Sequence, residues 1–141
     1  MKHAATDKPS IIASAIRMLR GFWTPSTSST AANRKKAINI DPAEVRRRLD
    51  EGTAILIDVR EPHEHARENI PEASLVPLSR FDSHDFSGDC RRAEAVIFHC
   101  QSGARTAMNA RRLLRSGFRD IFVLHGGLQA WKRAGFSTSQ G

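Results

Sequence analysis

Residues 95–106, which read AVIFHCQSGART, decide the fold of this protein. The run at 95–99 is short and mostly apolar, as in a strand that is buried on both faces of a parallel sheet. Helical spacing begins near Ala104 and continues to Arg115. The stretch therefore predicts a strand, a tight loop and a helix in succession.

The same alternation of strand and helix extends over the chain from residue 38. Apolar runs typical of short strands occur at residues 38–40, 54–59, 75–76 and 121–124. The run Asp41-Pro42-Ala43-Glu44 combines a capping Asp with Pro and Glu in the first helical turn, and predicts a helix that ends near Gly52. A last helix follows Gly126-Gly127. This order predicts an α/β domain with a small, mainly parallel β-sheet flanked by helices.

The positive charge of the chain is concentrated near its start. The 141 residues carry a formal net charge of +7, yet residues 1–37 hold seven Lys and Arg against one Asp. A nucleic-acid-binding domain would need a one-sided basic patch with aromatic or helical readout elements, and the sequence from residue 38 onward has neither. We therefore expect no nucleic-acid partner.

The chain divides into four predicted parts. Residues 1–23 are a basic extension, and at 100° per residue the apolar side chains at positions 11, 12, 15, 16, 18, 19, 22 and 23 fall within a sector of about 160°. Such an amphipathic helix docks on its own domain, associates with a second copy or lies at a membrane surface, and a removed organelle presequence is a further interpretation. Residues 24–37 predict a flexible linker, residues 38–136 the folded domain and residues 137–141 a C-terminal tail.

Apolar length and cysteine content indicate the compartment. No apolar run approaches the roughly 18–20 residues that a transmembrane helix needs. Two cysteines cannot form a disulfide framework, which favours a reducing environment. We expect a cytoplasmic protein, with peripheral membrane contact left open by the amphipathic pattern.

The loop after the run at 95–99 has the features of a nucleophilic anion site. In an open α/β sheet, ligands bind beyond the carboxyl ends of the strands. Backbone N–H groups of the loop and of the first helical turn favour negative charge there, and with it the thiolate form of Cys100. Gly103 lets the backbone curl around the sulfur, and Arg105 adds a cation with several donors. A buried, inert cysteine is the alternative that this context disfavours.

The second cysteine and three histidines attract other interpretations. The strand at 95–99 spans ~16 Å at about 3.3 Å per residue, so we expect Cys90 to lie too far from Cys100 for a disulfide. His63 and His65 have no third ligand in register, and we predict no metal. His99 ends a buried strand and is expected to pack or to brace the loop rather than to act as a base.

These residues resemble the rhodanese-domain sulfurtransferases, and the similarity extends over residues 38–136. Besides the loop, the matching segments are DVRE (58–61), HEH (63–65), NIPEA (69–73) and VLHGGLQAWKRAG (123–135). The chain looks most like the rhodanese domain of bacterial membrane-anchored sulfurtransferases, which carry transmembrane segments after the domain. Glu72 stands where much of the family has Gly, a difference that lies outside the loop.

The resemblance implies a two-step transfer of sulfur without a cofactor. A Cys100 thiolate would take a sulfane sulfur from a small anionic donor such as thiosulfate, and cyanide or a thiol would remove it from the resulting persulfide. Asp58 and Arg60 on the neighbouring strand, together with Thr106, are expected to brace the loop. The backbone amides of the loop would bind the anion. They belong to Gln101, Ser102, Gly103, Ala104 and Arg105.

Loop length and composition separate the related activities. Four residues lie between Cys100 and Arg105, whereas the phosphatase branch of this fold resembles Cys-x5-Arg, a wider ring suited to phosphoryl oxygens. We therefore favour sulfur transfer over a Cys-dependent phosphatase or arsenate reductase. Gln101 and Arg105 also differ from the Cys-Gly-Ser/Thr-Gly-Val-Thr loop of mercaptopyruvate-using relatives, which favours thiosulfate. A persulfide carrier or regulatory module without turnover remains an alternative.

Overall fold

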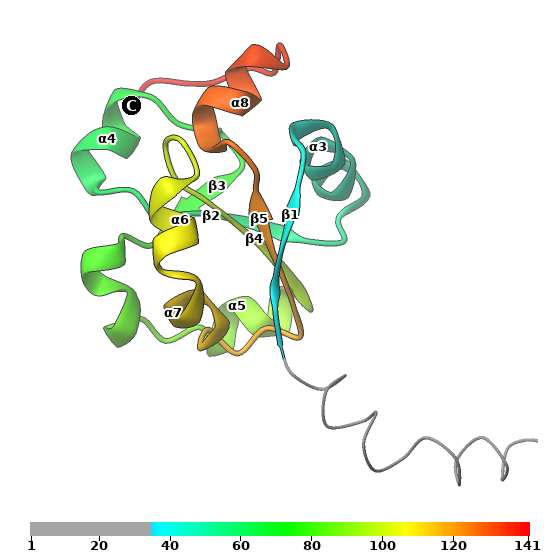
Figure 1. Cartoon of the computed structure of the whole chain (residues 1–141), viewed down its shortest axis with the longest axis vertical. Helices are drawn as coiled ribbons and strands as arrows, with labels where there is room; N and C mark the ends of the chain where they lie inside the picture. The colour runs from blue at the N-terminus through cyan, green and yellow to red at the C-terminus, as the bar shows by residue number, and fades with distance from the viewer. Residues whose placement is uncertain (1–34) are drawn as a thin grey trace, which may run out of the picture. The chain divides into compact units, whose positions relative to one another are not determined.

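A five-stranded parallel sheet forms the centre of the computed structural model, which describes residues 35–141 (Figure 1). The strand order is β1-β5-β4-β2-β3, and all four pairings are parallel. The strands are β1 (Ala37–Ile40), β2 (Ile55–Asp58), β3 (Ala73–Leu75), β4 (Ala95–His99) and β5 (Asp120–Leu124). The predicted α/β fold with a parallel sheet is thus confirmed. The predicted amphipathic helix at 11–23 and most of the predicted linker lie outside the described residues.

Helices cover both faces of the sheet and bury two apolar cores. They are α3 (Pro42–Glu51), α4 (Pro62–Arg67), the 3₁₀ helix η1 (Leu78–Ser83), α5 (Ser87–Arg92), α6 (Ala104–Met108), α7 (Ala110–Leu114) and α8 (Gly127–Arg133). All five residues of β4 are buried, as expected for a central parallel strand. Val96 and Phe98 point into the core with η1 and α7, while Ala95 and Ile97 point into the core with α3 and α8.

Helix α3 begins and ends where the sequence predicts. The Asp41 carboxylate accepts a hydrogen bond from the backbone N–H of Glu44 at 2.8 Å, and Pro42 occupies the first turn. Gly52 ends the helix with φ of 71°, and its N–H donates to the carbonyls of Arg48 and Leu49. A side chain would be strained in this left-handed conformation, which explains the glycine.

We expect Asp41→Ala to destabilise the protein by about 1 kcal/mol, because it leaves an N–H of the first turn without its acceptor. Urea denaturation of the variant and the wild type measures this loss. The matched control is Asp50→Ala, which removes an exposed carboxylate from the same helix and only a surface ion pair with Arg46. The control should lose less than about 0.5 kcal/mol, and equal losses in both variants would contradict the capping role.

The helix predicted over residues 104–115 is wrong in its continuity, because the structure divides it into α6 and α7 at Asn109. That residue has φ of −114° and ψ of 22°, outside the helical region. Its side-chain amide donates to the carbonyl of Arg105 at 2.8 Å and its side-chain oxygen accepts from Arg112 at 3.1 Å. Asn competes in this way for backbone hydrogen bonds, which is why it interrupts helices.

The segment between β2 and β4 contains more structure than the sequence pattern predicts. Helices α4, η1 and α5 are all absent from the prediction, and β3 lies at Ala73–Leu75 rather than at residues 75–76. A signal for α4 was present, since Pro62 and Glu64 repeat the Pro and Glu spacing that begins α3. The residue at the N-cap of α5, Phe86, makes no side-chain capping bond, so the Pro and Glu spacing of α3 and α4 is not repeated there.

The residues predicted as a C-terminal tail lie against the end of α4. Asn69 and Ser139 exchange two backbone hydrogen bonds of 2.8 Å, and the N–H of Gly141 donates to the carbonyl of Ala66. The indole N–H of Trp131 donates to the carbonyl of Ser137 at 2.9 Å. These bonds attach residues 137–141 to the folded domain.

The parallel pairing gathers the predicted site residues at one edge of the sheet. Asp58 at the end of β2 is in register with His99 at the end of β4. Cys100 follows His99 directly and Arg60 lies two residues after Asp58, so both chain segments leave the sheet side by side.

Over residues 35–141, no helix is long and apolar enough to cross a membrane.

Candidate active site

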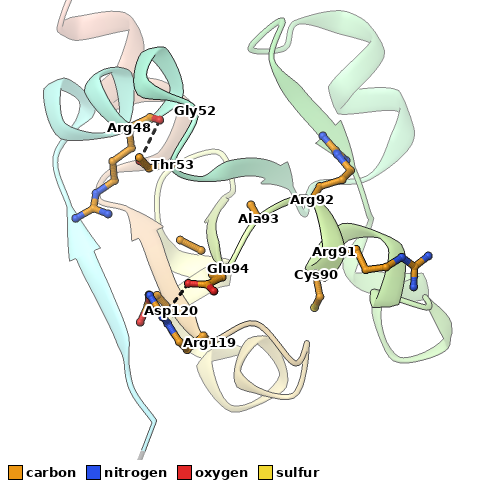
Figure 2. A pocket seen from close by; sticks show the side chains of 11 residues that line it. Arg48, Gly52, Thr53, Cys90, Arg91, Arg92, Ala93, Glu94, Arg119 and Asp120 are labelled. Atoms are coloured by element: carbon orange, nitrogen blue, oxygen red, sulfur yellow. Dashed lines mark hydrogen bonds and ion pairs between the residues drawn. The ribbon is translucent and has the colours of Figure 1, made fainter.

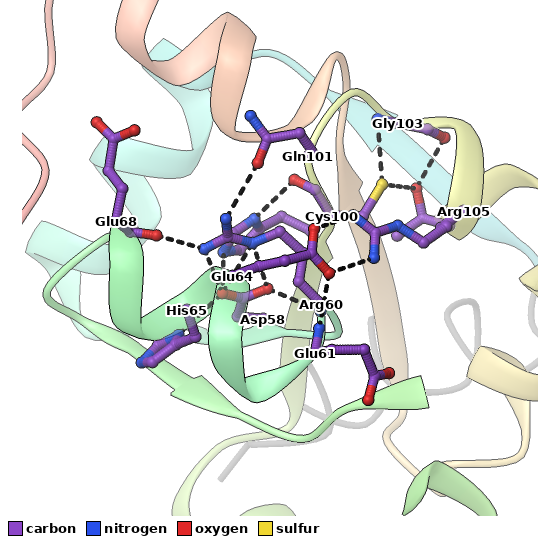
Figure 3. Close-up of polar contacts among 12 residues, drawn as sticks. Asp58, Arg60, Glu61, Glu64, His65, Glu68, Cys100, Gln101, Gly103 and Arg105 are labelled. Carbon is purple, nitrogen blue, oxygen red and sulfur yellow. Dashed lines mark hydrogen bonds and ion pairs between the residues drawn. The ribbon is translucent and has the colours of Figure 1, made fainter. Parts of the chain in front are cut away.

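The Cys100 sulfur lies inside the loop that follows β4. The thiol is buried, with 1% of the residue exposed, and the N–H of Gly103 donates to its Sγ at 3.1 Å (Figure 3). Gly103 adopts φ of 98° immediately before α6, which turns its N–H toward the sulfur. The Thr106 hydroxyl lies 3.7 Å from Sγ and donates to the carbonyl of Gly103 at 3.0 Å, which ties the two sides of the loop together. The arrangement gives the sulfur a donor from the backbone.

The start of α8 holds the loop by its backbone. The N–H of Leu128 donates to the carbonyl of Cys100 at 2.9 Å, and the N–H of Gln129 donates to that of Gln101 at 3.1 Å. Gly127 permits this approach, because a Cβ at its position would lie 2.5 Å from the Cys100 oxygen. In the sequence, Gly126-Gly127 predicts only the start of a helix and gives no signal for this contact with the loop.

We expect Gly127→Ala to lower the free energy of unfolding by about 2–4 kcal/mol. The backbone there has φ of +62°, which disfavours a side chain by ~1 kcal/mol, and the clash with the loop adds overpacking of about 1–3 kcal/mol. The matched control is Gly52→Ala, where φ is +71° and nothing lies within 4 Å of the added Cβ. Urea denaturation should show a loss of only about 1 kcal/mol for the control. Equal losses would mean that the close contact with the loop is unimportant.

A buried ion pair connects β2 to the loop. The Arg60 guanidinium donates to both carboxylate oxygens of Asp58, with the shortest contact at 2.8 Å, and neither side chain is more than 2% exposed. The same guanidinium donates to the side-chain oxygen of Gln101 at 3.0 Å and to the carbonyl of Glu68 at 2.7 Å. Burial by itself would raise the pKa of Asp58, but the bonds from Arg60 and other neighbours outweigh it and lower that pKa. These are the contacts that the predicted bracing role requires.

Two histidines adjoin this pair. His99 is buried, and its Nδ1 lies 3.0 Å from the carbonyl oxygen of Cys100. A carbonyl only accepts, so Nδ1 carries the hydrogen, and burial lowers the pKa of His99 and keeps the ring neutral. Its Nε2 has no hydrogen-bond partner among residues 35–141 and lies 3.8 Å from Asp58. His65 contacts the same carboxylate through Nδ1 at 2.9 Å. His99 therefore positions the carbonyl of Cys100 rather than the sulfur.

Glu64 lies at the candidate site, although the sequence gives no signal that it pairs with the loop. Its two carboxylate oxygens accept from Nη1 and Nη2 of Arg105, both at 2.7 Å (Figure 3). The hydrogen bonds from Arg105 lower the pKa of Glu64 to about 2, and Glu64 in turn raises the pKa of Arg105. Arg105 thus lies at the loop as predicted, but as half of an ion pair. A cavity of about 210 Å³ opens beside this pair, and its walls include Arg60, Glu64 and Gln101.

Cys90 lies at the other end of the sheet. Both cysteines are free in the structure. Cys90 is half-buried, and it lines a cavity of about 630 Å³ together with Ala95 and Asp120, the first residues of β4 and β5 (Figure 2). Cys100, in contrast, follows the last residue of β4 at the opposite end of that strand.

Within residues 35–141, no group of three or more His, Cys, Asp or Glu is placed to hold a metal ion.

The chain belongs to the rhodanese-like domain family, whose model matches residues 41–134. An uncharacterized protein of Synechocystis is 34% identical over 111 residues, which are 79% of this chain and 59% of that protein. A protein of Allochromatium vinosum named sulfurtransferase is 31% identical over 97 residues, which are 68% of this chain and 89% of that protein.

The fold is likewise that of solved rhodanese structures. A thiosulfate sulfurtransferase from Pseudomonas aeruginosa superposes with a TM-score of 0.63 at 23% identity, over 74% of this chain and 20% of that protein. A match at this level of identity establishes the fold alone. The family model spans Cys100 and the loop that follows β4.

Proposed function

We propose that the protein transfers a sulfane sulfur from thiosulfate, or a similar anionic donor, to cyanide or a thiol through a persulfide on Cys100. The observation that carries this proposal is the donor contact from Gly103 N–H to the Cys100 sulfur inside a loop closed by Thr106. Membership of the rhodanese-like family and the name of the Allochromatium relative support the same chemistry.

The chemistry divides into two nucleophilic steps. The Cys100 thiolate attacks the outer sulfur of thiosulfate, the S–S bond of the donor breaks, and its electron pair leaves with sulfite. The enzyme then holds Cys–S–S⁻. In the second step the acceptor attacks the terminal sulfur, and the bond to Cys100 breaks with its electron pair returning to the thiolate. Cyanide becomes thiocyanate, and no proton transfer is needed if the thiolate is already formed.

Loop geometry supports sulfur over phosphoryl transfer. Backbone N–H groups in a closed loop stabilise the charge that forms on a small leaving anion and on the persulfide. Arg105, which would bind phosphoryl oxygens in a phosphatase, instead gives one N–H from each terminal nitrogen to Glu64. The terminal sulfur of the persulfide would lie about 2 Å beyond the Cys100 Sγ, which is the length of an S–S bond. This extension brings the transferable atom closer to the mouth of the loop.

Intact mass and turnover test the proposal together. Purified protein is incubated with thiosulfate, and its mass is compared before and after the addition of cyanide. We expect an adduct of about 32 Da on Cys100 that cyanide removes as thiocyanate. A stable adduct that cyanide does not discharge would identify a carrier without turnover. Absence of the adduct with thiosulfate, combined with hydrolysis of a phosphate ester, would overturn the proposal.

A further inference from the structure

Glu64 holds the guanidinium of Arg105 in a fixed position beside the loop. The two parallel bonds of 2.7 Å form a bidentate pair, the strong and directional form of this interaction (Figure 3). Glu64 is also fixed by its own helix, because the N–H of Glu61 donates to its Oε2 at 3.0 Å. Arg105 and Glu64 are 35% and 19% exposed, so the pair lies at the mouth of the site.

The pair presents little net charge to an incoming anion. Glu64 stays ionised well below neutral pH because the hydrogen bonds from Arg105 lower its pKa to about 2. The attraction of Arg105 for an anion is then opposed by a negative charge directly behind it. Arg60, which donates to Gln101 of the loop, is likewise compensated by Asp58. The attraction for an anion then comes mainly from the partial charge of the backbone amides and from Arg67, which lines the same cavity.

We propose that Glu64 sets how strongly the site discriminates between donors of different charge, by weakening its attraction for dianions such as thiosulfate more than its attraction for sulfane donors with a single negative charge. This inference rests on the proposed sulfur transfer. Glu64 acts through Arg105 and does not touch the reacting sulfur, so it is a positioning and specificity residue. The repulsion between Glu64 and a donor is proportional to the negative charge of the donor, so Glu64 weakens the binding of a dianion more than that of a monoanion.

A pair of donors that differ by one charge tests the inference directly. Thiosulfate carries two negative charges and releases sulfite, whereas methanethiosulfonate carries one and releases methanesulfinate, with the same outer sulfur transferred. In Glu64→Gln the side chain keeps its shape but loses its charge. We expect the KM for thiosulfate to fall about tenfold and the KM for methanethiosulfonate to fall about threefold. These values correspond to a Glu64 charge roughly 7 Å from the bound donor, at intermediate dielectric and with salt screening. The changes in KM that Glu64→Gln causes for the two donors should become more alike as salt is added, because salt screens the Glu64 charge.

Two variants control for charge and for structure. Glu64→Asp retains the carboxylate and should keep the wild-type preference between donors. Glu72→Gln removes the same charge at an ion pair with Arg46 on α3, away from the loop, and should leave both KM values unchanged. A matching decrease in Glu72→Gln would mean that net charge alone is responsible, and the inference would be wrong.

A binding measurement separates failure of the inference from failure of the proposed function. Sulfate and methanesulfonate, which carry two charges and one, are tested for protection of Cys100 against alkylation by iodoacetamide. In Glu64→Gln we expect half-protection at about tenfold less sulfate, with a smaller change for methanesulfonate. Unchanged protection by sulfate overturns the inference even if both donors are turned over. Improved protection without any thiocyanate supports the inference and refutes the proposed transfer.

Discussion

Replacement of Cys100 by Ser is expected to reduce thiosulfate:cyanide turnover by at least about 10³-fold and to remove the mass adduct entirely. Serine keeps nearly the same shape, so its hydroxyl fits where the N–H of Gly103 now contacts Sγ at 3.1 Å. An alcohol, however, ionises far less readily than a thiol and forms no persulfide. The loss should therefore appear in kcat, with no change in the urea midpoint of unfolding.

Cys90→Ser is the matched control for this experiment. The second cysteine is free and half-buried, and its Sγ lies 3.9 Å from the carbonyl of Ser116, away from the loop. We expect wild-type turnover and the full adduct in this variant. If the adduct formed in Cys100→Ser but not in Cys90→Ser, Cys90 would be the residue that accepts the sulfur. That result would refute the proposed mechanism.

The parts of the site that sequence alone predicts are those with local signals. The apolar run at Ala95–His99, followed by Cys100 and Gly103, marks a strand and a loop because burial and backbone conformation are decided by neighbouring residues. Asp41 and Gly52 mark the ends of α3 for the same reason. Each of these features lies within about five residues of the structure it specifies.

The parts that sequence missed depend on contacts between distant residues. Glu64 and Arg105 are 41 positions apart, and no local pattern indicates that one charge compensates the other. The contact of Gly127 with the carbonyl of Cys100 likewise appears only after β4 and α8 have packed. The fold class was therefore predictable from periodicity. The electrostatic balance of the loop, which depends on its neighbours in space, was not.

Asp58→Asn is expected to destabilise the protein by about 3–5 kcal/mol at neutral pH, the loss typical of a buried ion pair with one partner removed. Asparagine preserves the shape of the side chain but leaves the Arg60 guanidinium, which is 2% exposed, without its counter-charge. Urea denaturation at pH 7 measures the loss. As a control, Asp82→Asn removes a 63% exposed carboxylate that meets Arg112 and Arg115 at 3.4 Å, and should lose less than about 1 kcal/mol.

The pH dependence of this difference identifies its electrostatic origin. The pKa of Asp58 in the folded protein lies below the ordinary value of 3.8, so its charged form stabilises the fold. That contribution is present above pH 3.8 and falls away as the pH decreases toward the folded-state pKa. The gap between wild type and Asp58→Asn should therefore stay constant from pH 7 to about pH 5 and narrow in stronger acid. A gap that does not narrow would indicate that Asp58 stabilises the protein through packing and neutral hydrogen bonds. In that case the bonds from Arg60 to the Gln101 side chain and to the Glu68 carbonyl would brace the loop without a contribution from the charge of Asp58.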